Sequence, residues 1–479
     1  VGIGLFAMLS VVNCLSFVIY GFGISRRLVM ICMQTTPAEI KGFSSELFSN
    51  LGHLLLSWRA LSSMAAVAVL FLAVRRVGKA LFTGAVCLLT AAGLVSTVVF
   101  SFTYTSGRSA HSLFMRVYRY VEATVAELGE FERLRSGMTD FPRPETVSSS
   151  HLARTVVVVI GESASRDHWS LYGYPLETTP FADSIRESLY VFPDVIGSSA
   201  STSGNMERIL TFKPDDDTEG DGLRFPRVVD MFGHAGYKTF WLSNQERTGL
   251  VSNTSGILAS NADVIEYVGS ESSEDALLFK HDDALLPPFR EALADTAACK
   301  LVFVHLIGSH TDYSFRYPAD AAVFSADDEL ALPMRPWLDR ESAGVVAAYD
   351  NSIRFTDAVL REIVTDIAGL DEPAVMVYLS DHGENVYDRN MFRGRDRDFV
   401  RVPFIVFVND AYRQSAPEMT AALEAAVARP FSTAGLVHPL MTLSGTGYCD
   451  YDSTYDVLSE HYRIRPRYVD ERIWDVSDK

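Results

Sequence analysis

Cysteine is scarce in this sequence, and positive charge is in deficit. The five cysteines form no C-x-x-C pair and no zinc-finger spacing, so a cysteine-based metal or redox motif is not indicated. Cys299 and Cys449 could join in a disulfide in an oxidising compartment, but two free thiols in a large domain are the simpler interpretation. Lysine and arginine total 42 against 60 aspartates and glutamates, a formal net charge of −18. This balance argues against a nucleic-acid partner, because phosphate binding needs clustered basic side chains.

Charge is also missing from long stretches near the N-terminus. Residues 1–23 and 80–102 contain no charged side chain, and residues 51–74 contain only Arg59. At about 1.5 Å per residue, a helix of this length spans a hydrocarbon core of about 30 Å. We therefore predict three transmembrane helices in residues 1–104. A cleaved signal peptide over the first segment and buried helices of a soluble core are the alternatives.

A short basic loop, residues 75–79, separates the second and third segments and predicts their orientation. Such loops tend to stay cytoplasmic, which places the chain after about residue 104 outside the cytoplasm, although Arg26 and Arg27 count against this. Residues 105–150 read as an interfacial amphipathic helix and a polar linker, with an ordinary surface helix as the alternative. Residues 151–479 are then an extracytoplasmic catalytic domain.

The rest of the chain alternates apolar, β-rich runs with helical patterns. The strand candidates are residues 155–161, 189–197, 237–243, 300–308, 374–380 and 402–408. Runs that are apolar on both faces and separated by helices are typical of a largely parallel sheet covered on both sides. The predicted fold class is therefore α/β, with N-terminal transmembrane helices followed by an α/β/α sandwich domain.

Titratable and polar side chains follow several of these predicted strands. In such sheets ligands bind beyond the carboxyl ends of the strands, so these residues should meet at one edge. Carboxylates, imidazoles and a hydroxyl suit Zn²⁺ or a similar divalent ion, which would activate the hydroxyl and neutralise a phosphoryl group. The residues in these positions are Glu162, Asn244, His305, His310, Asp381 and His382.

The hydroxyl is not identified by spacing alone. The loop before the predicted helix "NMERILTF" offers five candidates, and a residue near that helix N-terminus is equally explained as an N-cap. The same position favours an incoming phosphate, because free N–H groups and the helix dipole point at it. The candidates are Ser198, Ser199, Ser201, Thr202 and Ser203.

These residues lie in stretches that resemble a known family, the membrane-bound phosphoethanolamine transferases of Gram-negative bacteria, within the alkaline phosphatase/sulfatase superfamily. The resemblance runs in the family's order over nearly the whole chain. The stretches are "QTTPAEIKGF", "VVVIGESASRDHWSLYGYPLETTP", "FPDVIGSSASTSGNMERILTF", "FWLSNQ", "HLIGSHTDYSFRYP", "AYDNSIRFTD" and "YLSDHGENVYD".

The resemblance implies a zinc enzyme of the bacterial inner membrane whose catalytic domain faces the periplasm. Phosphatidylethanolamine would donate phosphoethanolamine to a threonine, leaving diacylglycerol, and lipid A, a core sugar or another envelope acceptor would then take the group. The family has five transmembrane helices, so two would lie upstream of Val1.

The family's functional residues map onto this sequence position by position. Thr202 falls at the nucleophile and completes the ligands of the tightly held zinc, with Glu162, Asp381 and His382. His310 falls near the substrate phosphate or a second metal. The positions expected near the donor lipid are His305, Asn244, Glu39 and Thr36.

Two departures from the family pattern bear on specificity and on the second metal. No cysteine lies between Asp194 and Phe212, which resembles the branch that acts on core sugars or other acceptors rather than on lipid A. No histidine follows Glu384 in "NVYDRNMFRGRDRDFVRVPF", where many members have one, and Arg393 or Arg395 is our candidate substitute.

The alternative functions are those of a phosphoglycerol transferase, of a sulfatase-like hydrolase and of a catalytically inactive relative. No C/S-x-P-x-R motif, which a sulfatase would need, is found.

Overall fold

A computed structural model describes residues 147–475, apart from 200, 215, 218–224, 246–249, 270–279, 389–396, 449–450 and 470–471. The chain divides into two units, Val1–Ser136 and Gly137–Lys479. The predicted transmembrane helices and interfacial helix therefore lie outside the described residues, as do Thr36, Glu39, Arg393, Arg395 and Cys449. Among the described helices, none has the length and apolar character needed to cross a membrane. Cys299 has a buried, free thiol.

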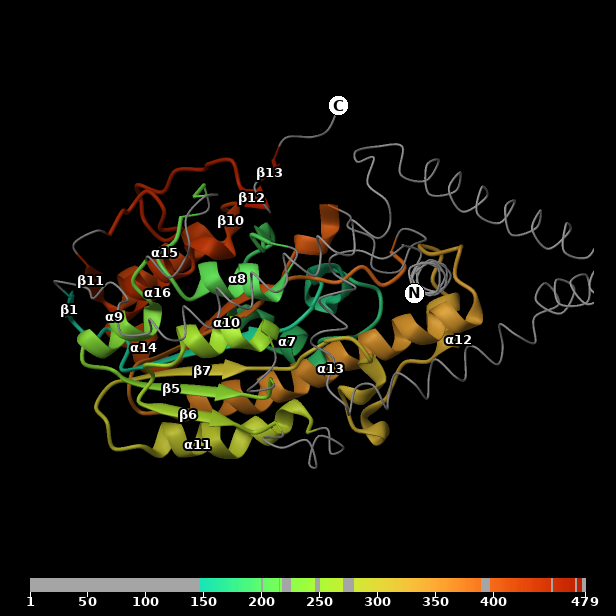
Figure 1. The fold of residues 1–479 in the computed structure, drawn as a ribbon, viewed down its shortest axis with the longest axis horizontal. Helices are drawn as coiled ribbons and strands as arrows, with labels where there is room; N and C mark the ends of the chain where they lie inside the picture. The colour runs from blue at the N-terminus through green and yellow to red at the C-terminus, as the bar shows by residue number, and fades with distance from the viewer. Residues whose placement is uncertain are drawn as a thin grey trace, which may run out of the picture. The chain divides into compact units, whose positions relative to one another are not determined.

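A seven-stranded sheet forms the centre of the described domain (Figure 1). Its five parallel strands are neighbours, and β9 runs antiparallel to both β8 and β3. The largely parallel sheet that the apolar runs predicted is confirmed. In order across the sheet, the strands are β3 (Leu189–Val191), β9 (Phe404–Val408), β8 (Ala374–Ser380), β2 (Thr155–Gly161), β7 (Lys300–His305), β5 (Lys238–Ser243) and β6 (Val264–Tyr267).

The predicted strand over residues 189–197 is wrong in one respect, because it is two strands. Pro193 lies between them and has no N–H to donate to a ladder. β3 pairs with β9, whereas β4 (Val195–Ile196) leaves the sheet and pairs with β10 (Phe431–Ser432). The chain is thereby redirected just before the serine-rich loop. Edge strand β6 was not predicted, because it is short and only half-buried.

Helices cover both faces of the sheet, each over its own apolar core. One face, called here the α8 face, packs against α8 (Thr202–Ile209), α9 (Val228–His234), α10 (Leu250–Leu258), α14 (Asp410–Ser415), α15 (Pro417–Ala426) and α16 (Val437–Ser444). The other, the α13 face, packs against α7 (Pro180–Ser184), α11 (Leu286–Ala294) and the 29-residue α13 (Arg340–Ala368). The predicted α/β/α layering is therefore confirmed.

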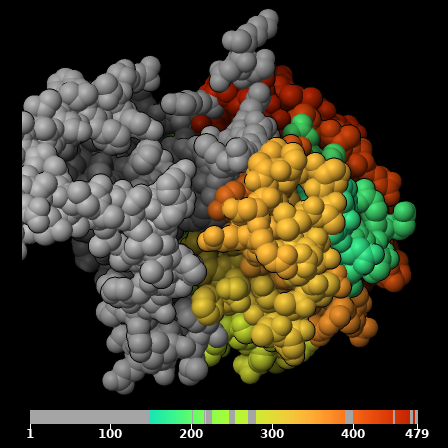
Figure 2. Space-filling view, turned by 90° about the vertical axis from the view of Figure 1, so that its right-hand side faces the viewer, coloured from blue at the N-terminus to red at the C-terminus, as the bar shows by residue number. Residues whose placement is uncertain are grey.

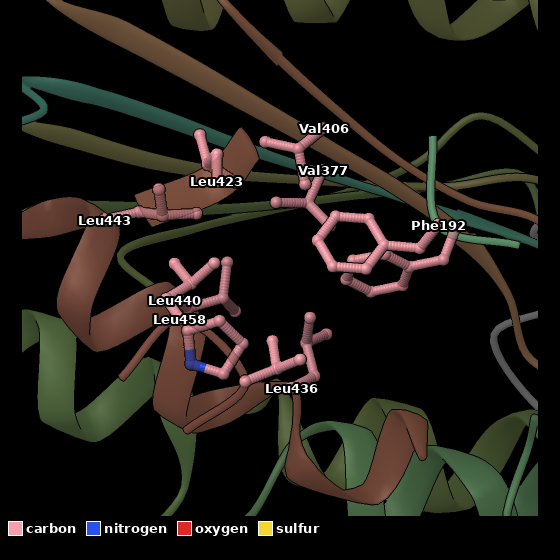
Figure 3. A pocket seen from close by; sticks show the side chains of 11 residues that line it. Phe192, Val377, Val406, Leu423, Leu436, Leu440, Leu443 and Leu458 are labelled. Carbon is pink, nitrogen blue, oxygen red and sulfur yellow. The ribbon is translucent and has the colours of Figure 1, made fainter. Parts of the chain in front are cut away.

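The core on the α8 face is closely packed. A small apolar cavity in this core has a volume of about 10 Å³ and lies between α16 and strands β8 and β9 (Figure 3). That volume is at the lower limit for a single water, and the lining offers no polar partner for one. This cavity is a packing defect with no capacity for a substrate.

The alternation of side chains along the strands decides which layer the site faces. Val158 and Ile160 of β2 belong to the core on the α8 face, so Glu162, two residues on, is directed to the same face. In Figure 1 the arrows of β5, β6 and β7 point toward the side where α12 (Ala326–Leu330) lies, and Figure 2 views the domain from that side. The same alternation, applied to β7 and β8, places His305 and Asp381 on the α8 face at this edge.

Candidate metal centre

Three predicted ligands meet at the carboxyl edge of the sheet. Glu162 follows β2, and Asp381 and His382 follow the neighbouring strand β8, whose Asp381 N–H donates to the Gly161 carbonyl at 3.1 Å. One ligand atom from each of the three lies within 4.8 Å of the others, and all three residues are buried. Adjacent parallel strands therefore bring together residues that are more than 200 positions apart.

The ligand atoms are held in orientations that suit a cation. Asp381 Oδ1 accepts hydrogen bonds from the N–H groups of Ser163 and His382 at 3.0 and 2.7 Å, while its Oδ2 is buried without a hydrogen-bond partner among the described residues. His382 Nδ1 donates to the Gly383 carbonyl at 2.6 Å. That bond leaves the Nε2 lone pair free to face the carboxylates, as in most metal-binding histidines.

The electrostatics of the triad are unfavourable without a cation. Burial, together with the charge of Asp381, raises the pKa of Glu162 to about 8. Burial alone would lower the pKa of His382, but the charges of Asp381 and Glu162 raise it. Two buried carboxylates side by side repel each other unless a positive charge lies between them. The donor set, two carboxylates and one imidazole, fits a zinc-like divalent ion.

Thr202 is the hydroxyl that contacts this triad. Its Oγ1 lies 3.3 Å from both carboxylate oxygens of Glu162 and 3.4 Å from His382 Nε2. Thr202 is the first residue of α8, and the N-cap role falls to Ser201, whose side chain accepts from the Gly204 N–H. The hydroxyl of Ser198 donates instead to Asn205. The structure thus separates the capping residue from the one that faces the ligands.

The two predicted histidines on the β7 side occupy different environments. His305 is buried, and burial lowers its pKa to about 4, so its imidazole is neutral. Its Nδ1 lies 3.2 Å from the Ser243 hydroxyl, and its Nε2 is buried without a hydrogen-bond partner among the described groups. His310 is exposed on the loop that follows β7 and is not part of the triad.

Gln245, which the sequence pattern did not single out, contacts the triad where Asn244 does not. The Asn244 amide is buried and donates to the Lys280 carbonyl and to the Asp282 carboxylate. Gln245 Nε2 lies 3.4 Å from Glu162 Oε2 and donates to the Leu306 carbonyl at 2.9 Å. The signal was present, since both residues follow β5, but sequence spacing does not reveal which of two neighbours points inward.

Gly308 should be intolerant of any side chain. Its φ is +49°, and a Cβ there would lie 2.8 Å from both the backbone nitrogen and oxygen of Glu162. We expect Gly308→Ala to lower the melting temperature and weaken metal binding, because it strains the backbone by about 1–2 kcal/mol and also displaces a ligand. Gly173→Ala is the matched control: φ there is +101°, and nothing lies within 4 Å. Equal effects of the two variants on metal binding would contradict this account.

A second group of charges lies on the α13 side of the same edge, buried except for the partly exposed Asp388, and the sequence did not predict it. His168 Nδ1 lies 2.5 Å from Asp350 Oδ1, and its Nε2 lies 3.1 Å from Asp388 Oδ1. Arg335 bonds to the same Asp388 oxygen. Burial alone would lower the pKa of His168, but the charges of Asp350 and Asp388 raise it to about 9. The imidazole is therefore charged at neutral pH.

This raised pKa predicts a pH-dependent contribution of His168 to stability. Because the pKa is about 9 in the folded protein and about 6.5 unfolded, the contribution is complete below pH 6.5 and is lost as the pH rises through 9. The largest contribution that this pKa difference allows to the free energy of unfolding is about 3 kcal/mol. We expect the stability difference between wild type and His168→Asn, measured by denaturant unfolding, to shrink between pH 6.5 and 9. A difference that stays constant over this range would contradict a charged His168.

Comparisons with known proteins agree with this geometry. The family model described as Sulfatase matches residues 154–446. Phosphoethanolamine transferase EptC of Escherichia coli O18:K1:H7 (strain RS218 / NMEC) is 32% identical over 331 residues, which cover 67% of this chain and 56% of that protein. The chain thus spans little more than half the length of the curated relatives it matches.

Two solved structures extend the comparison. The C-terminal periplasmic domain of Escherichia coli EptC in complex with Zn is 30% identical, with a TM-score of 0.61, over 69% of this chain and 93% of that one. The integral membrane protein EptA from Neisseria meningitidis has a TM-score of 0.64 over 95% of this chain and 86% of that one, and at 18% identity it shows a shared fold. The family match covers more than half of the chain, including every strand of the central sheet and the triad at its edge, and so the chain belongs to the sulfatase family.

Proposed function

We propose that this protein is a zinc-dependent phosphoethanolamine transferase that uses Thr202 as its nucleophile. The observation that carries the proposal is the Thr202 hydroxyl, held 3.3 Å from Glu162 and 3.4 Å from His382 at the edge of a buried ligand triad. The names of the relatives support the transferred group, and the zinc complex of Escherichia coli EptC supports the metal.

Glu162, Asp381 and His382 would hold the ion, with the Thr202 oxygen as a fourth ligand. When bound, zinc supplies positive charge that lowers the pKa of the hydroxyl and offsets the charge of the phosphoryl group. The chain contributes the orientation: backbone N–H groups fix Asp381 Oδ1, the Gly383 carbonyl fixes the His382 ring, and α8 presents Thr202. Backbone N–H groups in the first turn of α8 would bind the phosphate oxygens.

The reaction proceeds in two displacements at phosphorus. Thr202 Oγ1 attacks the phosphorus of phosphatidylethanolamine, the phosphorus–oxygen bond to diacylglycerol breaks, and diacylglycerol leaves as the alcohol after taking up a proton. The hydroxyl of the acceptor then loses its proton and attacks the phosphorus of the phosphoethanolamine group carried by Thr202. The bond from phosphorus to Thr202 Oγ1 breaks, and Thr202 recovers its hydroxyl. Glu162, 3.3 Å from Oγ1, is within reach of the proton that Thr202 gives up and regains. We assign His310, exposed on the loop after β7, to the substrate phosphate or a second metal, and His305, Asn244 and Glu39 to the donor lipid.

The proposed location is the bacterial inner membrane, with residues 151–479 facing the periplasm. The uncharged segments within residues 1–104 support the membrane part. One structural relative is described as an integral membrane protein and another as a periplasmic domain. The proposed acceptors are lipid A, a core sugar or another envelope component, and no nucleic acid is involved.

The donor distinguishes this proposal from its alternatives. The full chain would be reconstituted with zinc in lipid nanodiscs containing either phosphatidylethanolamine or phosphatidylglycerol, and release of diacylglycerol would be measured. We expect release from phosphatidylethanolamine alone, and its loss when a chelator removes the metal. Release from phosphatidylglycerol would indicate a phosphoglycerol transferase instead, and release from neither lipid would favour an inactive relative.

A further inference from the structure

We propose that Asp388, His168 and Arg335 form a positioning clamp that holds together the two loops carrying the metal ligands. The clamp is distinct from the triad, and none of its members is assigned to the ion or the substrate. The inference rests on the proposed metal site, because its consequence is the affinity of that site for zinc.

Asp388 is the centre of the clamp. Its Oδ1 accepts hydrogen bonds from Arg335 Nη2 and Nε at 2.7 and 3.1 Å and from His168 Nε2 at 3.1 Å. Arg335 Nη2 also lies 2.9 Å from His168 Nε2, and its charge acts to lower the pKa of His168, against the larger effect of the two carboxylates. Two cationic donors on one carboxylate hold the pKa of Asp388 well below its usual range, against the opposing effect of burial. Asp388 is therefore charged at neutral pH.

The clamp joins segments that begin at the metal ligands. On one side, the loop from Asp381 ends at Asp388, where the Asn385 side chain accepts the Asp388 N–H and Trp337 Nε1 donates to the Tyr387 carbonyl at 2.7 Å. Tyr387 has a φ of +61°, a backbone conformation that needs such fixation.

On the other side, the loop from Glu162 reaches His168 six residues later. The Tyr349 hydroxyl of α13 fixes its first part, accepting from the Ser165 N–H and donating to the Ser163 carbonyl, both at 2.7 Å. His168 fixes its end through Asp350 on the same helix. Each loop is thereby fixed at both ends. Strand pairing fixes the end with the metal ligand, and the clamp fixes the other, so the separation of Glu162 from Asp381 is held constant.

Charge balance explains why this group is stable when buried. Asp350 and Asp388 are matched by Arg335 and the charged His168. Glu329, also in contact with Arg335, has a pKa raised to about 8 by burial and by Asp350, so it is neutral at pH 7. Removing one charge leaves its partners buried and uncompensated, and the loops must then rearrange.

The test measures zinc affinity by competition with a chromophoric chelator, using the purified full-length chain. We expect Asp388→Asn, which keeps the shape but removes the charge, to weaken zinc binding about tenfold, as loss of supporting hydrogen bonds at metal sites does. Asp388→Glu should restore part of the affinity. Arg335→Lys, which keeps the charge but loses the two-pronged contact, provides a second variant if Asp388→Asn does not fold. The double variant Asp388→Asn/Arg335→Lys should lose little more zinc affinity than the weaker-binding single variant, because both substitutions break the same contact.

Asp230→Asn is the matched control. It breaks the 2.6 Å ion pair between Asp230 of α9 and Arg227, the N-cap residue of that helix, on the α8 face of the sheet, and should leave zinc affinity unchanged. Wild-type zinc affinity in Asp388→Asn, or an equal loss in Asp230→Asn, would overturn the clamp and leave the proposed function intact. A wild-type chain that binds no zinc would instead overturn the proposed metal site.

Discussion

Thr202→Ala is expected to reduce diacylglycerol release from phosphatidylethanolamine by about 10³-fold or more, because it removes the attacking atom. Thr202 Oγ1 is the hydroxyl that lies within 3.4 Å of both Glu162 and His382. Its neighbours Ser198 and Ser201 are engaged elsewhere, the first with Asn205 and the second as the cap of α8. The measurement is single-turnover release of diacylglycerol by the zinc-loaded chain in nanodiscs.

The fold of this variant should be unaffected. Ser201, not Thr202, caps α8, and Thr202 is only half-buried, so unfolding stability should change by no more than about 0.5 kcal/mol. Thr202→Ser keeps a hydroxyl at the same atom and should retain measurable turnover, which makes it the control for general disturbance of the loop. Substantial release by Thr202→Ala in a folded, zinc-loaded sample would show that the nucleophile lies elsewhere.

Asp381→Asn is expected to lower zinc affinity by about 10²-fold or more, because it replaces a charged ligand with a neutral one. The buried Oδ2 of Asp381 has no hydrogen-bond partner among the described residues and lies 3.4 Å from His382 Nε2, so both ligand atoms are placed to share a cation. Elemental analysis of the purified full-length protein measures the metal content, and chelator competition measures the affinity.

The same variant should make the metal-free protein more stable. Burial and the charge of Asp381 raise the pKa of Glu162 to about 8, so at neutral pH Glu162 must take up a proton when the protein folds, and removing the Asp381 charge reduces this cost. The amide oxygen that the substitution introduces can still accept from the Ser163 and His382 N–H groups, which preserves the loop. Thermal unfolding without metal should therefore show a higher melting temperature for Asp381→Asn than for wild type.

Asp357→Asn is the control for this prediction. Asp357 is also a buried carboxylate, but it accepts from the Phe181 and Ala182 N–H groups on the α13 face, away from the triad. It should leave zinc affinity as in wild type. A metal-free Asp381→Asn protein less stable than wild type would mean that the carboxylate is structural rather than a ligand held in readiness.

Local sequence patterns predicted the sheet well, because burial on both faces leaves a continuous apolar run. The runs over residues 155–161 and 374–380 match β2 and β8 residue for residue. The antiparallel direction of β9 was not predictable, since an apolar run indicates burial but not whether the strand is parallel or antiparallel to its neighbour. The apolar pattern also wrongly predicted one strand across Pro193, where the missing N–H divides β3 from β4.

The site was only partly predictable for a different reason. Glu162, Asp381 and His382 could be grouped because each follows a strand, and parallel strands end at one edge. The clamp could not be predicted, because His168, Arg335 and Asp388 come from three separate segments joined only by tertiary contacts. Choosing Thr202 among five hydroxyls likewise required either the family resemblance or the structure.

The most direct test of the central claim is the mass of the peptide that contains Thr202 after the zinc-loaded chain has been incubated with phosphatidylethanolamine without an acceptor. We predict a peptide heavier by one phosphoethanolamine group, with fragmentation that places the group on Thr202, and its loss when an acceptor is added. An unmodified Thr202 peptide in a sample that releases diacylglycerol, or the group on another residue, would contradict the account.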